Sequence, residues 1–196
     1  YHEQHETYGT LNNQTLSAID ISVITTVKDA VDALATQIAA QSIDKSAFGS
    51  TIRDGSHHFW DNYSSLSQKE YPYSDLHHVC QNIIADYPSL VTEASAVITA
   101  VDNAVLHAYA GSYYGGYLNG TSGGLSIFFS RGDELYGGDP QYAYHWWYTS
   151  IPVPPADPYL GNIDFCTFDD DGVVETWVEL MEYWYDPADT LTWTTY

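Results

Sequence analysis

The two cysteines of the chain, Cys80 and Cys166, are its candidates for nucleophilic chemistry. Asp164 lies two residues before Cys166, and a cysteine with a histidine nearby in the fold can act as a thiolate nucleophile. Two simpler interpretations stand beside this one. Cys166 is a buried core thiol, or it forms the single disulfide that two cysteines permit, with Cys80 as its partner.

A histidine and a cysteine also occur together in the run His77-His78-Val79-Cys80. His77 and Cys80 are three residues apart, so on a helix they share one face and could both reach a metal ion. A zinc site needs three or four ligands, and no second cluster with ligand spacing accompanies this one. We therefore expect Cys80 in the core and His78 facing solvent. The pair His57-His58, in a polar segment, is a weaker candidate still.

Clustered carboxylates at Asp169, Asp170 and Asp171, followed by Gly172, suggest a calcium site. An EF-hand loop with Gly172 at its sixth position would begin at Thr167 and end at Val178, so both key ligands are missing. A cation site of another kind remains an alternative for these three aspartates. We prefer an acidic turn that precedes a helix, because negative charge is favourable at a helix N-terminus. No other cofactor is indicated.

Two further motifs lie in the second half of the chain. Residues 137–161 are irregular and rich in proline and aromatic residues. These aromatic residues could stack on sugars or on an extended peptide, or they pack against the domain or form an interface with a neighbouring chain. The aromatic cluster of this segment is Tyr142, Tyr144, Trp146, Trp147 and Tyr148. The tripeptide Arg131-Gly132-Asp133 matches a cell-adhesion signal, but a polar turn after a strand explains it more simply.

The charge balance limits the partners of the chain. Five Lys and Arg face 26 Asp and Glu, giving a formal net charge of -21, which argues against binding to nucleic acid or to an anionic membrane. No apolar run is long enough for a transmembrane helix, so we expect no membrane insertion. The chain begins without Met, which suggests a processed product or a piece of a longer precursor. Sequons that favour a secreted or cell-surface glycoprotein occur at Asn13, Asn62 and Asn119.

The positions of these residues depend on the elements that the periodicity predicts. Residues 15–22 indicate a short buried strand. Apolar residues at helical spacing then predict a helix through about residue 40, with Ser22 as the N-cap of this helix. Residues 41–73 suggest short helices and loops. Residues 74–87 form a helix with Leu76, Val79, Cys80 and Ile83 on its buried face, and Pro88 ends it and starts the next helix.

That next helix is the clearest in the sequence, with an apolar stripe of about five turns that we expect to include Val105 and Ala108. Gly123 and Gly124 then allow a tight entry into a strand over 125–129, buried on both faces. A last helix follows Gly172, and its buried side is expected to contain Val174, Trp177, Val178, Met181 and Trp184.

The resulting fold class is a helix-rich α/β domain with few strands and four to five helices, spanning residues 1–196 as one domain. Two strands cannot form a stable buried sheet alone. Either further strands lie in the irregular segments, or a partner segment or another copy of the chain completes the sheet.

The order of these elements resembles the C-terminal half of the clostripain-like cysteine peptidases. The segments that carry the resemblance run almost the length of the chain: NNQTLSAIDIS, DLHHVCQNII, AVLHAYAGSYY, GGLSIFF, NIDF and TWVELMEYWY. The family counterparts are a TLSAIDLS strand, a DLYDFA helix, a GLSIYFP strand and a final helix of the WDEFLEAYY kind. Each segment is weak alone, and their common order makes the match moderately specific.

The resemblance implies a caspase-like fold and places the catalytic His and Cys of the family upstream of the TLSAIDLS strand. No catalytic residue is therefore carried over to this chain. Asp164-Phe165-Cys166 aligns with a non-catalytic Asp-Phe-Ala segment, and Thr167-Phe168-Asp169 replaces the Leu-Met-Gly that follows the family nucleophile.

Two functions follow as hypotheses. In the first, the chain is the non-catalytic C-terminal portion of a secreted clostripain-like peptidase, and its partner is the catalytic portion of the same precursor. In the second, it is an extracellular structural protein whose copies associate by strand addition.

Overall fold

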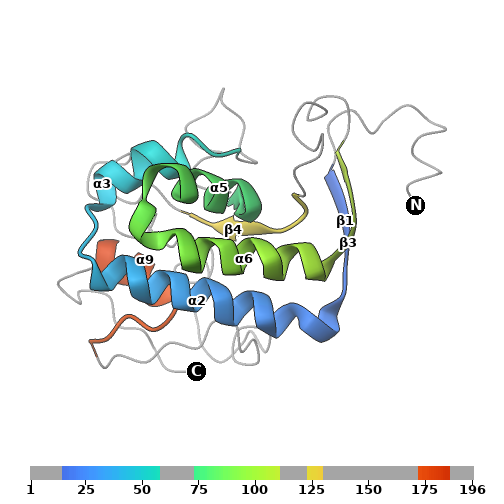
Figure 1. Ribbon diagram of the computed structural model, residues 1–196, viewed down its shortest axis with the longest axis horizontal. Helices are drawn as coiled ribbons and strands as arrows, with labels where there is room; N and C mark the ends of the chain where they lie inside the picture. The colour runs from blue at the N-terminus through green and yellow to red at the C-terminus, as the bar shows by residue number, and fades with distance from the viewer. Residues whose placement is uncertain (1–14, 58–72, 111–122, 130–171, 186–196) are drawn as a thin grey trace, which may run out of the picture.

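The structure is a computed structural model that describes residues 15–57, 73–110, 123–129 and 172–185 (Figure 1). Five α-helices and four short strands are present in this part of the chain, with short 3₁₀ and π segments between them. In chain order they are β1 Thr15–Ile19, η2 Ile21–Val23, α2 Ile24–Ala40, α3 Lys45–Phe48, η3 Gly49–Arg53, β2 Tyr73–Asp75, α5 Leu76–Asp86, η4 Pro88–Leu90, α6 Val91–Ala104, β3 Val105–Ala110, β4 Ser126–Phe128 and α9 Trp177–Tyr185. The expected helix-rich α/β class, with few strands and four to five helices, is confirmed.

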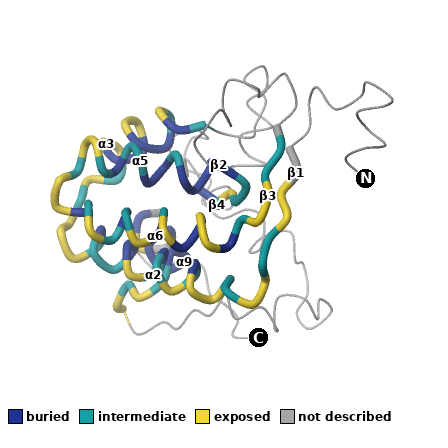
Figure 2. Tube along the Cα trace, turned by 45° about the vertical axis from the view of Figure 1, so that its right-hand side comes forward, coloured by how far each residue is buried: buried dark blue, intermediate teal, exposed yellow. Residues whose placement is uncertain are grey.

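The helices form the core of the described structure. α6 lies between α2 and α5, and α9 packs against α2 (Figure 1). The buried sides of these helices face one another, as the dark blue segments of the tube show (Figure 2). The apolar stripes predicted for α2 and α5 are confirmed, because Val27, Val31, Leu34 and Ile38 of α2 and Leu76, Val79, Cys80 and Ile83 of α5 are all buried.

Aspartates cap three helical segments, η2, α3 and α5. Asp20 accepts a hydrogen bond from the Ser22 N–H at 2.9 Å, Asp44 accepts one from Ala47 N–H at 2.8 Å, and Asp75 accepts one from His78 N–H at 2.9 Å. Each satisfies a backbone donor that has no partner within its helix. The expectation that Ser22 caps the first helix was wrong: Ser22 lies inside η2, which Asp20 caps, and α2 has Val23 at its N-cap without a side-chain hydrogen bond.

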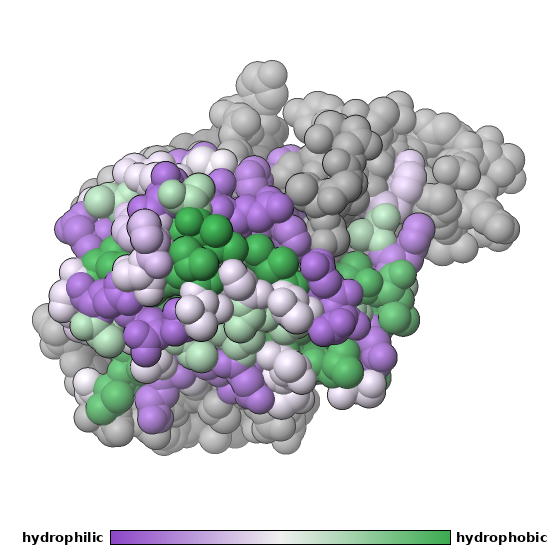
Figure 3. Space-filling view, viewed as in Figure 1, coloured by the Kyte–Doolittle hydropathy of each residue, from purple (hydrophilic) through white to green (hydrophobic). Residues whose placement is uncertain are grey.

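β1 pairs antiparallel with β3 in a two-stranded ladder that projects beside the helices (Figure 1). Ser17 and Ala18 are exposed, so the prediction of a buried strand over 15–22 was wrong in burial and in length. Apolar side chains are visible at the surface where the ladder joins the helices (Figure 3). The exposed large apolar residues there include Ile21, 81% exposed, and Leu106, 68% exposed.

The helix predicted over 88–108 is shorter than expected. It ends at Ala104, and Val105 and Ala108 belong to β3, where Val105 faces Ile19 and Ala108 faces Ser17. The four-residue spacing from Val101 to Val105 continues the helical pattern, so the periodicity gave no sign of the change. Pairing with β1 in a ladder decides the conformation here, and this pairing is not visible in the local sequence.

Gly124 brings the chain past this ladder into β4. Its φ is +126°, which L residues with a side chain rarely adopt, and a Cβ at this position would lie 3.0 Å from Val105 Cγ1. The Gly124 carbonyl accepts a 2.6 Å hydrogen bond from Ser17 Oγ. The predicted tight entry at the glycine pair is therefore confirmed at Gly124.

β4 pairs antiparallel with β2, with Tyr73 opposite Phe128 and Asp75 opposite Ser126. β4 is three residues long, and Ser126 is exposed while Phe128 is buried, so the predicted strand over 125–129 is confirmed but is shorter and is not buried on both faces.

In the last helix, Trp177, Val178, Met181 and Trp184 are buried as predicted. Val174 precedes the helix and is half-buried.

Candidate functional site

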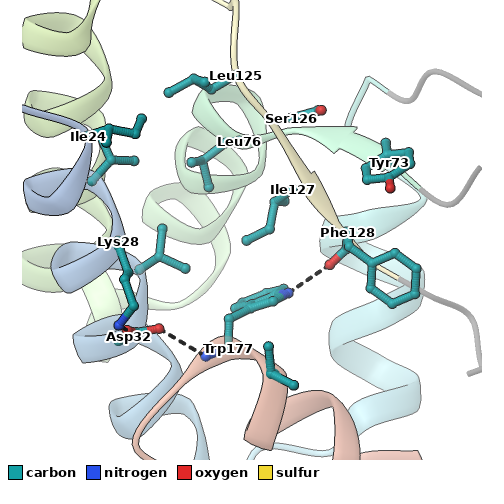
Figure 4. Close-up of a pocket in the computed structure, with 13 residues that line it drawn as sticks. Ile24, Lys28, Asp32, Tyr73, Leu76, Leu125, Ser126, Ile127, Phe128 and Trp177 are labelled. Carbon is teal, nitrogen blue, oxygen red and sulfur yellow. Dashed lines mark hydrogen bonds and ion pairs between the residues drawn. The ribbon is translucent and has the colours of Figure 1, made fainter. Parts of the chain in front are cut away.

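The described residues line an open apolar cavity of about 270 Å³ between α2, β4 and the start of α9 (Figure 4). We call this cavity the β4 slot. Its walls come from four parts of the chain that are far apart in sequence. The lining residues are Ile24, Val27, Lys28, Val31 and Asp32 of α2, Tyr73 and Leu76 at the junction of β2 and α5, Leu125, Ser126, Ile127 and Phe128 of the β4 segment, and Trp177 and Val178 of α9.

Trp177 closes one end of the slot. Its indole Nε1 donates a 2.7 Å hydrogen bond to the Phe128 carbonyl, as the dashed line in Figure 4 shows. The ring of Phe129 meets the Trp177 ring edge-to-face, with centroids 5.3 Å apart. Trp177 is 5% exposed, so this buried donor is satisfied and the ring is held in one orientation.

A charged pair lies beside the apolar wall of α2. Lys28 Nζ and Asp32 Oδ2 are 2.7 Å apart, one helical turn from each other. The other oxygen of this carboxylate, Asp32 Oδ1, accepts a hydrogen bond from the backbone N–H of Trp177 at 3.1 Å (Figure 4). The ion pair therefore balances the charge of Asp32, while the second oxygen joins α2 to the first residue of α9.

α9 begins with a capping box. Thr176 Oγ1 accepts from the Glu179 N–H at 3.3 Å, and Glu179 Oε2 accepts from the N–H of Thr176 at 2.8 Å and of Glu175 at 2.7 Å. This reciprocal pattern satisfies backbone donors at the helix start and fixes where the helix begins. Trp177, the first helical residue, is thereby placed at the end of the slot that it closes.

The edge of β4 that lies away from β2 also belongs to the slot. Leu76 N–H donates to the Leu125 carbonyl at 3.0 Å, just beyond the β2–β4 ladder. Hydrogen-bonded and non-hydrogen-bonded pairs alternate along antiparallel strands, so Ile127 turns its N–H and C=O toward β2. Ser126 and Phe128 turn theirs to the opposite edge, where Trp177 reaches the Phe128 carbonyl.

The thiol of Cys80 does not line the slot. It is a free thiol in the core with an exposed fraction of 0%. Burial, with a smaller contribution from the Asp75 carboxylate, raises the pKa of this thiol well above its ordinary value. A thiol in this environment stays protonated and is not a nucleophile, which agrees with the expectation that Cys80 is a core residue.

The histidines near Cys80 make structural contacts. His78 Nδ1 accepts a 3.0 Å hydrogen bond from the His57 backbone N–H, and burial lowers the pKa of His78. His78 is half-buried, so the prediction that it faces solvent was wrong. His77 is buried, with Nε2 3.6 Å from Asp102 Oδ1. Among the described residues, no group of three or more His, Cys, Asp or Glu side chains is arranged to hold a metal ion.

Several predicted sites lie outside the described residues. These are Cys166 and hence its disulfide with Cys80, the acidic turn Asp169 to Asp171, the sequons at Asn13, Asn62 and Asn119, the aromatic segment 137–161, the tripeptide 131–133 and His58. They stay predictions, and so does the assignment of residues 1–196 to one domain.

Sequence reasoning missed the residues that build the slot. Trp177 was predicted to be buried, but nothing local indicated that its indole N–H bonds to a carbonyl 49 residues away. Lys28 and Asp32 are four residues apart, and this spacing is the signal in the sequence from which their ion pair could be predicted. The run Thr176-Trp177-Val178-Glu179 likewise has the spacing of a capping box.

Within the described part of the chain, no helix is long and apolar enough to cross a membrane. Comparison with known proteins gives two further findings. The profile of the clostripain family matches residues 1–195. Clostripain from Hathewaya histolytica is 28% identical over 197 residues, which cover 92% of this chain and 37% of that relative. The chain thus spans little more than a third of the length of the relative that it matches.

Proposed function

The chain belongs to the clostripain family, and on this premise we propose that it is the non-catalytic C-terminal portion of a secreted clostripain-like cysteine peptidase. In this role it buttresses the catalytic portion of the same precursor. The catalytic portion would supply the His and Cys, and this chain would supply helices and strands against which it packs.

One observation carries the proposal: the β4 slot is built from segments that carry the family resemblance. β4 lies in GGLSIFF, α9 lies in TWVELMEYWY, and α2 follows TLSAIDIS. These segments form an apolar surface beside a strand edge, and among the described residues they bring no nucleophile and base together. Such a surface suits packing against another part of the protein.

The partial overlap with the relative agrees with this role. Nearly the whole chain aligns with little more than a third of the clostripain sequence. By the family resemblance, the catalytic His and Cys lie in the part ahead of the strand that begins at Thr15. Secretion is part of the proposal because the three sequons favour an exported glycoprotein.

The first experiment reads the codons that precede Tyr1 in the gene. We expect them to encode a segment with the catalytic His and an Asp-x-Cys-Leu-Met run. A signal peptide directly before Tyr1 would contradict the proposal.

The second experiment assays the purified 196-residue chain against a fluorogenic peptide library. We expect no turnover above that of a variant that carries both Cys80→Ala and Cys166→Ala. Turnover by the wild-type chain that disappears in Cys166→Ala alone would place the catalysis in this chain and overturn the non-catalytic assignment.

The alternative hypothesis of an extracellular assembly protein gains nothing from the family match. Copies that each carry a net charge of -21 repel one another, which opposes close association in the absence of a cationic partner.

A further inference from the structure

We propose that the β4 slot is the docking site for an extended apolar segment of the catalytic portion, which adds to the outer edge of β4 and packs over α2. This inference rests on the proposed function and names the surface through which it acts. The occupant is a β-strand with apolar side chains on the face that meets α2.

The backbone of β4 supplies the first argument. Within the described residues, β4 pairs with β2 alone. The alternation of the ladder directs the N–H and C=O of Ser126 toward the slot, as described above. An added strand binds through such groups on a sheet edge, and it places alternate side chains into pockets beside that edge.

The walls of the slot supply the second argument. Ile24, Val27 and Val31 line the slot from α2, and Leu76, Leu125 and Ile127 line it from the start of α5 and the β4 segment. Figure 4 shows Ile24 on the α2 side of the space and Leu125 and Ile127 on the β4 side. Helices of an α/β protein cover the faces of a sheet. A strand placed next to β4 would therefore find the surface of α2 already positioned to cover one of its faces.

Trp177 limits how far the added strand can extend. Its indole N–H holds the Phe128 carbonyl, which points to the same edge as the backbone groups of Ser126. A neighbouring strand would otherwise donate to that carbonyl. We therefore expect pairing around Ser126 and no further pairing at Phe128, which sets the register of the incoming segment.

The volume of the slot and the net charge of the chain indicate what kind of molecule occupies the slot. A volume of about 270 Å³ lies just below the range of about 300–1,000 Å³ that is usual for small-molecule sites. A second copy of this chain would bring a further charge of -21 to the interface. The clostripain relative, in contrast, has 63% of its length outside the match (100% minus the covered 37%).

The test uses the full 196-residue chain and a series of fluorescent 12-residue peptides that tile the part of Hathewaya histolytica clostripain outside the match. Backbone pairing supplies much of the affinity in strand addition, so peptides from a relative are suitable probes. Binding is measured by fluorescence anisotropy. We expect one or a few neighbouring peptides with alternating apolar residues to bind.

Two variants at one position separate edge pairing from general effects. Ser126→Pro removes the N–H that points to the slot and not a donor of the β2–β4 ladder, whereas Ser126→Thr keeps it. We expect about tenfold or greater weakening for Ser126→Pro and little change for Ser126→Thr. Ile24→Trp, which fills the slot from α2, gives a second loss of binding if Ser126→Pro fails to fold, as judged by circular dichroism.

Three outcomes would overturn the docking site. These are the absence of any binding peptide, equal binding by all three variants and wild type, and a self-association of the chain that Ser126→Pro abolishes, which would make a second copy the occupant. None of them depends on the codons before Tyr1 or on the turnover assay, so the docking site can fail while the proposed function stands.

Discussion

Asp32 in the middle of α2 and Trp177 at the first position of α9 are joined across 145 residues, because the Trp177 backbone N–H donates to Asp32 Oδ1 at 3.1 Å. A helix leaves its first N–H groups without partners, and this carboxylate satisfies one of them from a neighbouring helix. Its negative charge also lies at the positive end of the α9 dipole. Asp32 thereby fixes α9 against α2 at the edge of the β4 slot.

Asp32→Ala should therefore destabilise the chain by about 1–2 kcal/mol, because it leaves the N–H of a nearly buried residue without its acceptor. Asp32→Asn keeps an oxygen acceptor and loses the ion pair with Lys28, so we expect a cost below about 1 kcal/mol. Asp29→Ala, at an exposed acid of the same helix, is the control and should change stability by less than about 0.5 kcal/mol. Urea unfolding followed by circular dichroism measures all three. Equal costs for Ala and Asn at position 32 would show that the ion pair, and not the acceptor, matters.

The capping box of α9 makes a separate prediction. Glu179→Ala removes the acceptor for the N–H groups of Thr176 and Glu175 and should cost about 1 kcal/mol in unfolding free energy. Glu179→Gln retains a side-chain oxygen and should recover most of this loss. Glu175→Ala changes an exposed side chain at the same helix start and serves as the control. A Gln variant as unstable as the Ala variant would mean that the charge of Glu179 supplies the effect through the helix dipole.

The helices could be predicted from the sequence because their apolar stripes are local. Val27, Val31, Leu34 and Ile38 recur at helical spacing, and each is buried as this spacing indicates. β3 could not be predicted in this way. Val105 continues the spacing of α6, and its conformation depends on pairing with Ile19, 86 positions earlier in the numbering (105 minus 19).

The candidate site could not be predicted from local sequence patterns, for the same physical reason. A cavity requires the mutual placement of segments, and the slot combines residues from Ile24 to Val178. The sequence did contain the local devices that position Trp177, namely the Lys28–Asp32 spacing and the Thr176–Glu179 capping box. The cysteines, whose chemistry stands out in the sequence, do not contribute to this site. Cys80 is a core thiol that does not line the slot, and Cys166 lies outside the described residues.

Cys80 should be unreactive in the folded chain. The thiol is fully buried and its pKa is raised by burial, so little thiolate forms and reagents have no access to it. In a Cys166→Ala variant, Ellman's reagent at pH 8 should detect no thiol in the native state and one in guanidinium chloride. Fast labelling of the native variant would contradict the burial of this side chain.

The same reagent tests the predicted disulfide in the wild-type chain. Denaturation without a reductant should release two thiols if Cys80 is free, as in the structure. Detection of no thiol would establish the disulfide between Cys80 and Cys166 that the cysteine count permits.

His78 should make the chain less stable as the pH falls. Burial is the largest cause that lowers its pKa from the ordinary 6.5; the nearby His77 adds to this effect and the Asp75 carboxylate opposes it. In the pH range between the lowered native pKa and 6.5, the unfolded chain binds a proton at His78 and the native chain does not. Stability from this group is therefore present above pH 6.5 and is lost as the pH falls through and below that value.

The hydrogen bond to His78 gives the same sign. His78 Nδ1 accepts from the His57 N–H, and a protonated imidazole has no acceptor to offer. His78→Asn places an oxygen that can accept near the same position and does not titrate. Urea unfolding from pH 5 to 8 should therefore give a shallower pH dependence for this variant, with a difference of up to about one proton in the slope. His107→Asn, at an exposed histidine of β3, is the matched control. An identical slope for His78→Asn and wild type would show that His78 does not carry the pH dependence.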